Sequence, residues 1–203
     1  MANLRVATFN CAGLGTTARR KTIFDHLRST DIHLFCLQET HSSSADEIKW
    51  AEEWGEARAL FHSSSKNDRS NGVALLLNHS AIQFANWFGD QEGRILTADI
   101  SIQTTKIHVV NIYAPQRNHS LCSRIRFFDS LYSHIYSTHP TILTGDFNMV
   151  ENSTLDRDPH PIEATQSNLC KIYVLHLIYM IASGCYMEIS DSSHADKVNR
   201  SQD

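Results

Sequence analysis

The sequence lacks the cysteine patterns that organise small secreted domains and thiolate metal sites. It contains no CxxC pair, and its cysteines are Cys11, Cys36, Cys122, Cys170 and Cys185. Because five is an odd number, any disulfide scheme leaves one of them unpaired, so a reducing compartment fits best. The first residues also lack the charged start and apolar block of a secretory signal. We expect a nuclear or cytoplasmic protein that is not secreted.

An excess of positive charge is also missing. The formal net charge is −4 and the sequence pI is about 6.3, so the molecule as a whole is not drawn to nucleic acid. Any nucleic-acid binding must come from local basic patches, for which the alternative is ordinary solvated surface charge. The candidates are Arg19, Arg20 and Lys21, and further along the chain Arg117, Arg124 and Arg126.

Several motifs of other enzyme classes are absent. The sequence has no HExxH, no GxSxG and no P-loop, which lowers the case for a zinc protease, a serine hydrolase or a nucleotide triphosphatase. The twelve histidines are scattered, and we interpret them mainly as surface residues. The apolar run at 172–182 is too short to span a bilayer, so we expect no membrane association.

Length and hydrophobic periodicity favour one α/β domain. A chain of 203 residues with 41% hydrophobic residues can bury a substantial core. Helical spacing of apolar residues predicts helices at about 18–29, 45–54 and 120–136. Serines at 42–44 supply possible caps for the second helix. The apolar face of the third helix is predicted to contain Ile125, Phe128, Leu131, Tyr132 and Ile135.

Short apolar runs separated by polar or glycine-containing turns predict strands. The close spacing of the runs between 59 and 113 favours antiparallel neighbours. Strands combined with three covering helices indicate a four-layer α/β sandwich, in which two packed mixed sheets are flanked by helices and several loops gather at one edge. The predicted strands are 4–9, 32–37, 59–62, 72–77, 82–88, 95–102, 107–113 and 141–144.

Four polar segments interrupt or end predicted strands, and they are the candidates for chemistry. Burying the charge of Glu39 next to a core strand would cost several kcal/mol unless a cation or hydrogen bonds met it. Asp146 has the same character, and Asn148 lies on the same side of an extended chain. The segments are Thr8-Phe9-Asn10, Leu37-Gln38-Glu39-Thr40, Asn111-Ile112-Tyr113-Ala114-Pro115 and Gly145-Asp146-Phe147-Asn148.

Oxygen ligands without histidine or cysteine at metal spacing favour Mg²⁺, or Mn²⁺ in its place, over Zn²⁺. Each residue taken alone has an ordinary structural interpretation. A lone glutamate after a strand is more often a cap or an ion-pair partner, and a lone asparagine is usually a turn residue. The occurrence of all four segments at strand ends favours a functional site.

The same segments, together with Gly72-Val73-Ala74-Leu75-Leu76, resemble in order and spacing the apurinic-endonuclease-like domains of the endonuclease/exonuclease/phosphatase superfamily. Three segments look most like the endonuclease domain of LINE-type non-LTR retrotransposons. They are Gln38-Glu39-Thr40-His41, Asn111 to Pro115 and Ser153-Thr154-Leu155-Asp156-Arg157. The resemblance covers residues 4 to about 165. It implies Mg²⁺-dependent hydrolysis of phosphodiesters, in the form of DNA nicking.

The resemblance also implies roles for individual residues. Glu39 would bind the divalent cation with Asn10 beside it, and Asp146 would orient or deprotonate the attacking water. Asn148 would help to hold that water, and Tyr113 would contact the scissile phosphate. Tyr113, Asn148 and Gln116 form the expected substrate-binding set. The expected partners are duplex DNA and the flanking reverse transcriptase of an intact element, and we expect a monomer.

The chain departs from the family pattern after about residue 165. We expect residues 1–165 to form the catalytic domain, 166–189 a divergent apolar segment, and 190–203 a polar disordered tail, so that the sandwich is incomplete at its C-terminus. Family members end in a closing Ser-Asp-His motif. The segment Ser190-Asp191-Ser192-Ser193-His194 contains the same residue types, but two serines separate the aspartate from the histidine. Loss of that motif would remove transition-state stabilisation of a few kcal/mol and slow the reaction roughly a hundredfold or more.

Two alternatives to a DNA-nicking enzyme stay open at this point. One is a phosphodiesterase of the same superfamily that acts on RNA or a phospholipid. The other is a catalytically dead retrotransposon relic that folds poorly or only binds nucleic acid.

Overall fold

The computed structural model describes residues 4–66, 69–116, 119–135, 137–148 and 188–191. They form helices α1 (Thr17–Arg28), α2 (Ser44–Trp54) and α3 (Leu121–Ile135). The strands are β1 (Arg5–Asn10), β2 (Leu34–Gln38), β3 (Ala59–His62), β4 (Val73–Leu77), β5 (Ile82–Gly89), β6 (Ile95–Ile102), β7 (Thr105–Tyr113), β8 (Thr141–Asp146) and β9 (Glu188–Asp191).

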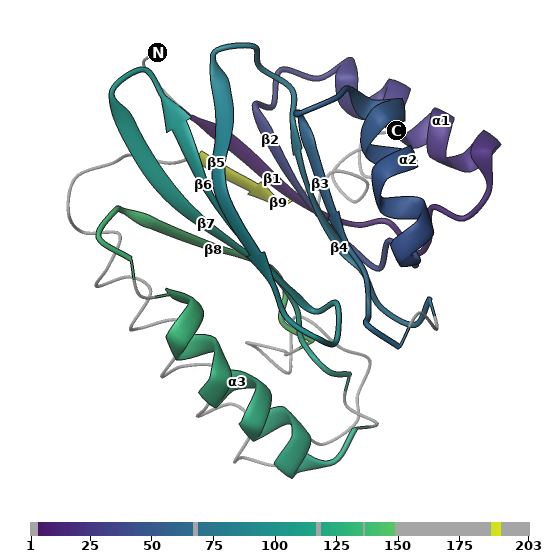
Figure 1. Cartoon of the computed structure of the whole chain (residues 1–203), viewed down its shortest axis with the longest axis vertical. Coiled ribbons are helices and arrows are strands. Elements are labelled where there is room, and N and C mark those ends of the chain that lie inside the picture. The colour runs from purple at the N-terminus through teal and green to yellow at the C-terminus, as the bar shows by residue number, and fades with distance from the viewer. Residues whose placement is uncertain (1–3, 67–68, 117–118, 136, 149–187, 192–203) are drawn as a thin grey trace, which may run out of the picture.

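The strands form two sheets that pack face to face. The first sheet has the order β3-β4-β2-β1-β9, and the second has the order β5-β6-β7-β8. Helices α1 and α2 cover the outer face of the first sheet, and α3 lies on the outer side of the second (Figure 1). This arrangement confirms the predicted four-layer α/β sandwich.

Both sheets are mixed, as predicted. The pairs β3–β4, β5–β6 and β6–β7 are antiparallel, in agreement with the closely spaced runs of the sequence. The pairs β1–β2 and β7–β8 are parallel, and each includes a helical crossover, α1 in the first sheet and α3 in the second. The carboxyl ends of two neighbouring strands therefore meet in each sheet.

The helix boundaries follow local capping chemistry. The Thr16 hydroxyl accepts a hydrogen bond from the backbone N–H of Arg19 at 3.3 Å and begins α1. Ser43 is the N-cap of α2, and its backbone N–H donates to Oδ2 of Asp46 at 3.0 Å, which is the return half of a capping box. The predicted helix ranges agree with the observed ones to within one residue at each end.

The predicted buried face of α3 is partly wrong. Phe128 and Leu131 are buried as expected, but Ile125 is 38% exposed and Tyr132 is 41% exposed. The inward face instead includes Phe127 and Arg124. The i, i+3, i+4, i+7 spacing of these four residues fits one helix face, and apolar periodicity could not include the arginine.

Three apolar layers hold the sandwich together. Leu34, Leu75, Leu96 and Val109 belong to the cluster between the two sheets. The cluster beneath α1 and α2 is rich in aromatic residues, and Phe24 meets Trp54 edge to face with ring centroids 5.2 Å apart. A third cluster joins Phe128 and Leu131 of α3 to the second sheet. A buried large side chain contributes about 1.5–3 kcal/mol, so these layers fix the relation of the two sheets.

The C-terminal predictions fall mostly outside the described residues, including the segment at 153–157, the apolar run at 172–182 and residues 192–203. Strand β9 pairs in parallel with β1, and Asp191 faces Thr8 in the register. Residues 190 and 191, which the sequence assigns to the tail, therefore belong to the first sheet. Among the described residues no helix is long and apolar enough to cross a membrane.

Candidate active site

The candidate site lies where the two parallel strand pairs end. In the first sheet Asn10, the last residue of β1, faces Gln38, the last residue of β2. In the second sheet Tyr113 at the end of β7 faces Asp146 at the end of β8. Glu39 follows β2 directly. The sandwich therefore brings polar residues from four strand ends to one edge.

Two hydrogen bonds cross from one sheet to the other at this edge. The Asn10 side-chain amide donates to Oδ2 of Asp146 at 3.1 Å. The Tyr113 hydroxyl donates to Oε1 of Glu39 at 2.7 Å. The structure thus brings together four of the residues that the sequence singles out, although the members of each pair are 136 and 74 positions apart.

The Asp146 carboxylate is oriented from two sides. Its Oδ2 accepts from Asn10, and its Oδ1 accepts from the backbone N–H of Asn148 at 2.8 Å. The side-chain amide of Asn148 donates to the backbone carbonyl of Ala114 at 2.7 Å and holds the loop after β8 against the end of β7. Asn148 therefore lies beside Asp146, with its amide nitrogen occupied by the chain itself.

Tyr113 is a protonated donor at neutral pH. Burial, and then its hydrogen bond to the Glu39 carboxylate, raise the pKa of Tyr113 to about 12. Gln116 donates from Nε2 to the same hydroxyl oxygen at 2.9 Å. The predicted substrate-binding residues Tyr113 and Gln116 are thus in direct contact, with the phenol between an amide donor and a carboxylate acceptor.

The backbone at Glu39 has an uncommon conformation. Its φ is +52°, in the left-handed region that non-glycine residues enter rarely. The backbone N–H of Gly13 donates to the carbonyl of Glu39 at 2.7 Å, and the Thr40 N–H donates to the Gly72 carbonyl at 3.0 Å. These bonds hold the turn that aims the carboxylate toward Tyr113.

The two carboxylates have little cationic compensation. Within the described residues no lysine or arginine nitrogen lies within 4.0 Å of Glu39 or Asp146, and His41 Nε2 is 4.0 Å from Oε2 of Glu39. No group of three or more His, Cys, Asp and Glu side chains in that part of the chain could hold a metal ion. The carboxylates of Glu39 and Asp146 and the side-chain carbonyl of Asn10 are hard oxygen donors. Such donors fit Mg²⁺ or Mn²⁺, with water molecules completing the coordination shell.

Two arginines that support the site have roles that the sequence did not reveal. Arg94 donates from Nη1 to the Tyr113 carbonyl at 3.2 Å, and its guanidinium carbon lies 5.2 Å from the centre of the Tyr113 ring. Arg124 is buried and donates to the Asn148 carbonyl at 3.1 Å, so it holds the loop after Asp146 instead of facing solvent. Burial lowers the pKa of the Arg124 guanidinium.

The other basic candidates have mixed outcomes. Arg20 is buried, so it cannot belong to a surface patch. Arg19 donates to the Gly13 and Cys11 carbonyls, whereas Lys21 is exposed. Arg117 lies outside the described residues. Arg126 is exposed and lines a groove beside the site.

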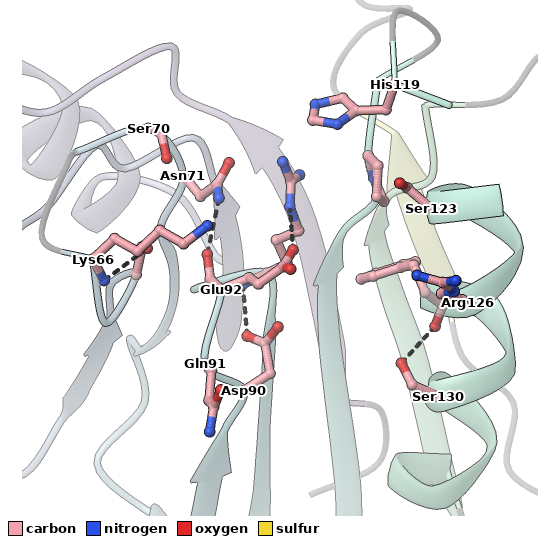
Figure 2. A pocket seen from close by; sticks show the side chains of 14 residues that line it. Lys66, Ser70, Asn71, Asp90, Gln91, Glu92, His119, Ser123, Arg126 and Ser130 are labelled. Atoms are coloured by element: carbon pink, nitrogen blue, oxygen red, sulfur yellow. Dashed lines mark hydrogen bonds and ion pairs between the residues drawn. The ribbon is translucent and has the colours of Figure 1, made fainter. Parts of the chain in front are cut away.

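This groove has a volume of about 600 Å³ and reaches the site at Pro115. Figure 2 shows Lys66 and Asn71 on one wall, Glu92 and Asp90 on the turn between β5 and β6, and Arg126 with neighbouring serines on the α3 wall. The lining residues are Ser64, Lys66, Ser70, Asn71, Asp90, Gln91, Glu92, Arg94, Pro115, His119, Ser123, Arg126, Phe127 and Ser130. Most of these side chains can form hydrogen bonds, so the groove suits a polar ligand.

Comparisons with known proteins agree with the fold. The chain is 27% identical over 170 residues to the Transposon TX1 uncharacterized 149 kDa protein of Xenopus laevis. This match covers 82% of this chain and 12% of that protein. The Xenopus laevis APE2 catalytic domain superposes with a TM-score of 0.63 at 18% identity, over 80% of this chain and 63% of that one.

The AP endonuclease LMAP from Leishmania major superposes with a TM-score of 0.61 at 18% identity, over 83% of this chain and 65% of that one. At these identities the two structures show a shared fold. Residues 7–167 match the endonuclease/exonuclease/phosphatase family, which is most of the chain. The chain therefore belongs to the endonuclease/exonuclease/phosphatase family.

Proposed function

We propose that this chain is a metal-dependent phosphodiesterase that nicks duplex DNA. The observation that carries the proposal is the pair of hydrogen bonds between the sheets, Asn10 to Asp146 and Tyr113 to Glu39. They gather two carboxylates, an amide and a phenol at one end of the sandwich, with no nearby lysine or arginine among the described residues. A site of this composition can bind a hard cation and a phosphodiester together.

Glu39 and Asn10 would hold Mg²⁺, or Mn²⁺ in its place, through oxygen atoms. A bound divalent cation would neutralise charge that develops on the phosphoryl oxygens and polarise the phosphate for attack. Asp146 would orient a water molecule and take its proton. Hydrogen bonds to both of its carboxylate oxygens hold the group in a fixed orientation for this role. Asn148 helps to define this position.

Tyr113 supplies a hydrogen bond to a non-bridging oxygen of the scissile phosphate. Its raised pKa keeps the hydroxyl protonated throughout the physiological range, so it can stabilise negative charge but cannot act as a base there. Gln116, which contacts the same hydroxyl, completes the substrate contact. Binding of a phosphate would require Tyr113 to share its proton between Glu39 and the substrate.

DNA is favoured as the substrate by the transposon relative and by the AP endonucleases that share the fold. The groove that Pro115 and Arg94 line offers hydroxyl, amide and basic side chains along a path that a nucleic-acid backbone can follow. In the cell, the domain would act in the nucleus or cytoplasm as a monomeric unit beside a reverse transcriptase.

The test is nicking of supercoiled plasmid with and without Mg²⁺. We expect the wild-type chain to nick in Mg²⁺ and to stop when the metal is chelated. Asp146→Ala should slow the reaction on the order of 100-fold or more because the general base is lost. Asp31→Ala is the matched control, since Asp31 lies in the loop before β2, at the far end of the first sheet, and its side chain is 75% exposed.

Equal nicking by the wild-type chain and Asp146→Ala would contradict the proposal. Absence of nicking by a cooperatively folded wild-type chain would instead favour a catalytically dead relic. Competition by duplex DNA, RNA and phospholipid vesicles in the same assay then separates the substrate classes. We expect duplex DNA to compete best.

A further inference from the structure

Two amide side chains are buried together between the sheets, directly beneath the candidate site. Gln38 is 1% exposed and Asn111 is 0% exposed. Gln38 Nε2 donates to Oδ1 of Asn111 at 2.7 Å, across the interface between β2 and β7. Their surroundings are otherwise the apolar cluster between the sheets, in which amides are kept only when their hydrogen bonds are satisfied.

The amide nitrogen of Asn111 is fully used. It donates to the backbone carbonyls of Leu37 at 2.9 Å and of Ala74 at 3.0 Å, two residues that face each other in β2 and β4. A side chain of the second sheet thus binds the backbone of two strands of the first. This contact fixes the distance between β7 and the first sheet and the position of β7 along β2.

Gln38 extends the same network to β1. Its Oε1 accepts from the Thr8 hydroxyl at 3.1 Å, and its Nε2 also donates to the Cys36 carbonyl at 2.8 Å. The network therefore reaches β1, β2, β4 and β7. Strands β1 and β7 end in site residues, and a site residue follows β2 directly. A shift of any of these three strands is therefore resisted by hydrogen bonds that apolar packing does not provide.

The network lies within one or two residues of each site residue on those strands. Gln38 immediately precedes Glu39, and Asn111 is two residues before Tyr113 on the same side of β7. Thr8 has the same relation to Asn10 on β1. The amide pair is thus a polar link between the sheets on the core side of the hydrogen bond from Tyr113 to Glu39.

We propose that Gln38 and Asn111 are positioning residues that hold Tyr113 against Glu39 and thereby fix the distance between the metal-binding and phosphate-binding halves of the site. Neither residue touches the substrate. The catalytic consequence rests on the proposed function, whereas the structural consequence can be measured without it.

The test replaces Asn111 with leucine, which has a similar size and no hydrogen bonds. The matched control is Asn78→Leu. The Asn78 amide donates to the carbonyls of Leu27, Thr30 and Ile32, and Asn78 follows β4 at the opposite end of the first sheet. Both variants lose bonds from a side-chain amide to backbone carbonyls, but only Asn111→Leu loses them beneath the site. Gln38→Met is a milder change for the case in which Asn111→Leu does not fold.

The primary readout is the ¹⁹F chemical shift of Tyr113 at neutral pH in the protein labelled with 3-fluorotyrosine, because that shift reports the packing and the hydrogen bonding of the phenol ring. Tyr113→Phe assigns the resonance among the six tyrosines. In the wild-type chain the Tyr113 resonance should lie apart from that of an exposed tyrosine, because Tyr113 is 3% exposed and its hydroxyl donates to Glu39 at 2.7 Å.

We expect the Tyr113 resonance to move toward the position of an exposed tyrosine in Asn111→Leu, and by a smaller amount in Gln38→Met, but not in Asn78→Leu. An unchanged resonance in both Asn111→Leu and Gln38→Met would overturn the proposal, and so would an equal change in Asn78→Leu. Where the wild-type chain nicks DNA, kcat should fall roughly 10- to 100-fold in Asn111→Leu and much less in Asn78→Leu. An inactive wild-type chain would count against the proposed function and would leave the NMR test intact.

Discussion

At the scale of single residues, the position of Asp146 depends on the glycine that precedes it. Gly145 has a φ of +132°, which residues other than glycine rarely adopt, and it lies in β8 directly against β7. A β-carbon at this position would overlap the carbonyl oxygen of Ile112 and lie 2.7 Å from its backbone nitrogen. The close approach of these strands is what places Asp146 beside Tyr113.

We predict that Gly145→Ala destabilises the protein by about 2–4 kcal/mol, because backbone strain and a clash between two strands act together. Nicking should fall as well, since β8 would have to move away from β7. Urea denaturation at neutral pH measures the stability. Gly15→Ala is the control, because no atom lies within 4 Å of the added carbon there, and it should change stability by less than about 1 kcal/mol. Similar losses in the two variants would show that the contact with Ile112 does not matter.

The sequence identified the residues of the candidate site, but it did not identify the hydrogen-bond partner of each residue. Apolar strands end at or directly before Asn10, Glu39, Tyr113 and Asp146, a pattern visible in the sequence alone, and the structure places these residues together. Which of them bond to each other could not be read from the sequence, because that depends on how two sheets align. The role of Asn111 was hidden for the same reason, since its partners come from strands of the other sheet.

At the scale of secondary-structure elements, α1 and α2 are joined by one buried arginine. The Arg20 side chain donates from Nε and Nη2 to the two carboxylate oxygens of Glu53 at 2.6 and 2.7 Å. It also donates to the Leu14 carbonyl at 2.9 Å, and its guanidinium carbon lies 4.7 Å from the centre of the Trp50 ring. This two-pronged geometry suits arginine and not lysine.

We predict that Glu53→Gln destabilises the protein by roughly 1–3 kcal/mol at pH 7, because it leaves the buried guanidinium without its counter-charge. The hydrogen bond from Arg20 holds the pKa of Glu53 below its usual value of 4.5. A lowered pKa in the folded state stabilises the protein above the unfolded-state pKa, and that contribution is lost as the pH falls through the folded-state value. The difference between wild type and variant should therefore shrink below about pH 4.5.

Urea denaturation at pH 7 and at a series of acidic pH values measures this difference. Glu52→Gln makes the same chemical change on an exposed neighbour in α2 and should alter stability by about 0.5 kcal/mol or less. A stability difference for Glu53→Gln that stays constant with pH would contradict the assigned ion pair.

Element boundaries were predictable, but the inward faces of the helices were only partly so. Apolar spacing located α1, α2 and α3 because each has a core-facing stripe. Hydrophobic patterns treat arginine as a surface residue, so they could not show that Arg20 and Arg124 are buried. Both are accommodated by specific acceptors, the Glu53 carboxylate and the Asn148 carbonyl, that lie far away in the sequence.

At the scale of the whole molecule, the two sheets bring the site and the groove to one region while the overall charge opposes nucleic acid. The net charge of −4 gives no general attraction to a phosphate backbone. In the groove, however, the acidic side chains are occupied. Asp90 accepts from the backbone N–H groups of Arg94 and Ile95, and Glu92 lies 3.4 Å from Arg94 Nε. Within the described residues Lys66 and Arg126 line the groove and form no ion pair, so their charges are available to a ligand there.

We predict that Lys66→Gln/Arg126→Gln weakens DNA binding and makes it less dependent on salt. Each lost phosphate contact lowers the slope of log K against log salt by about 0.9, so the double change should lower it by about 1–2. Binding to a duplex oligonucleotide in EDTA, which prevents cleavage, measures the slope by fluorescence anisotropy. Lys49→Gln/Lys106→Gln removes the same total charge from exposed positions on α2 and at the start of β7, away from the groove. A change in net charge alone would lower the slope equally in both double variants. If DNA binds in the groove, only Lys66→Gln/Arg126→Gln should lower the slope. Equal slopes would place the DNA elsewhere on the molecule.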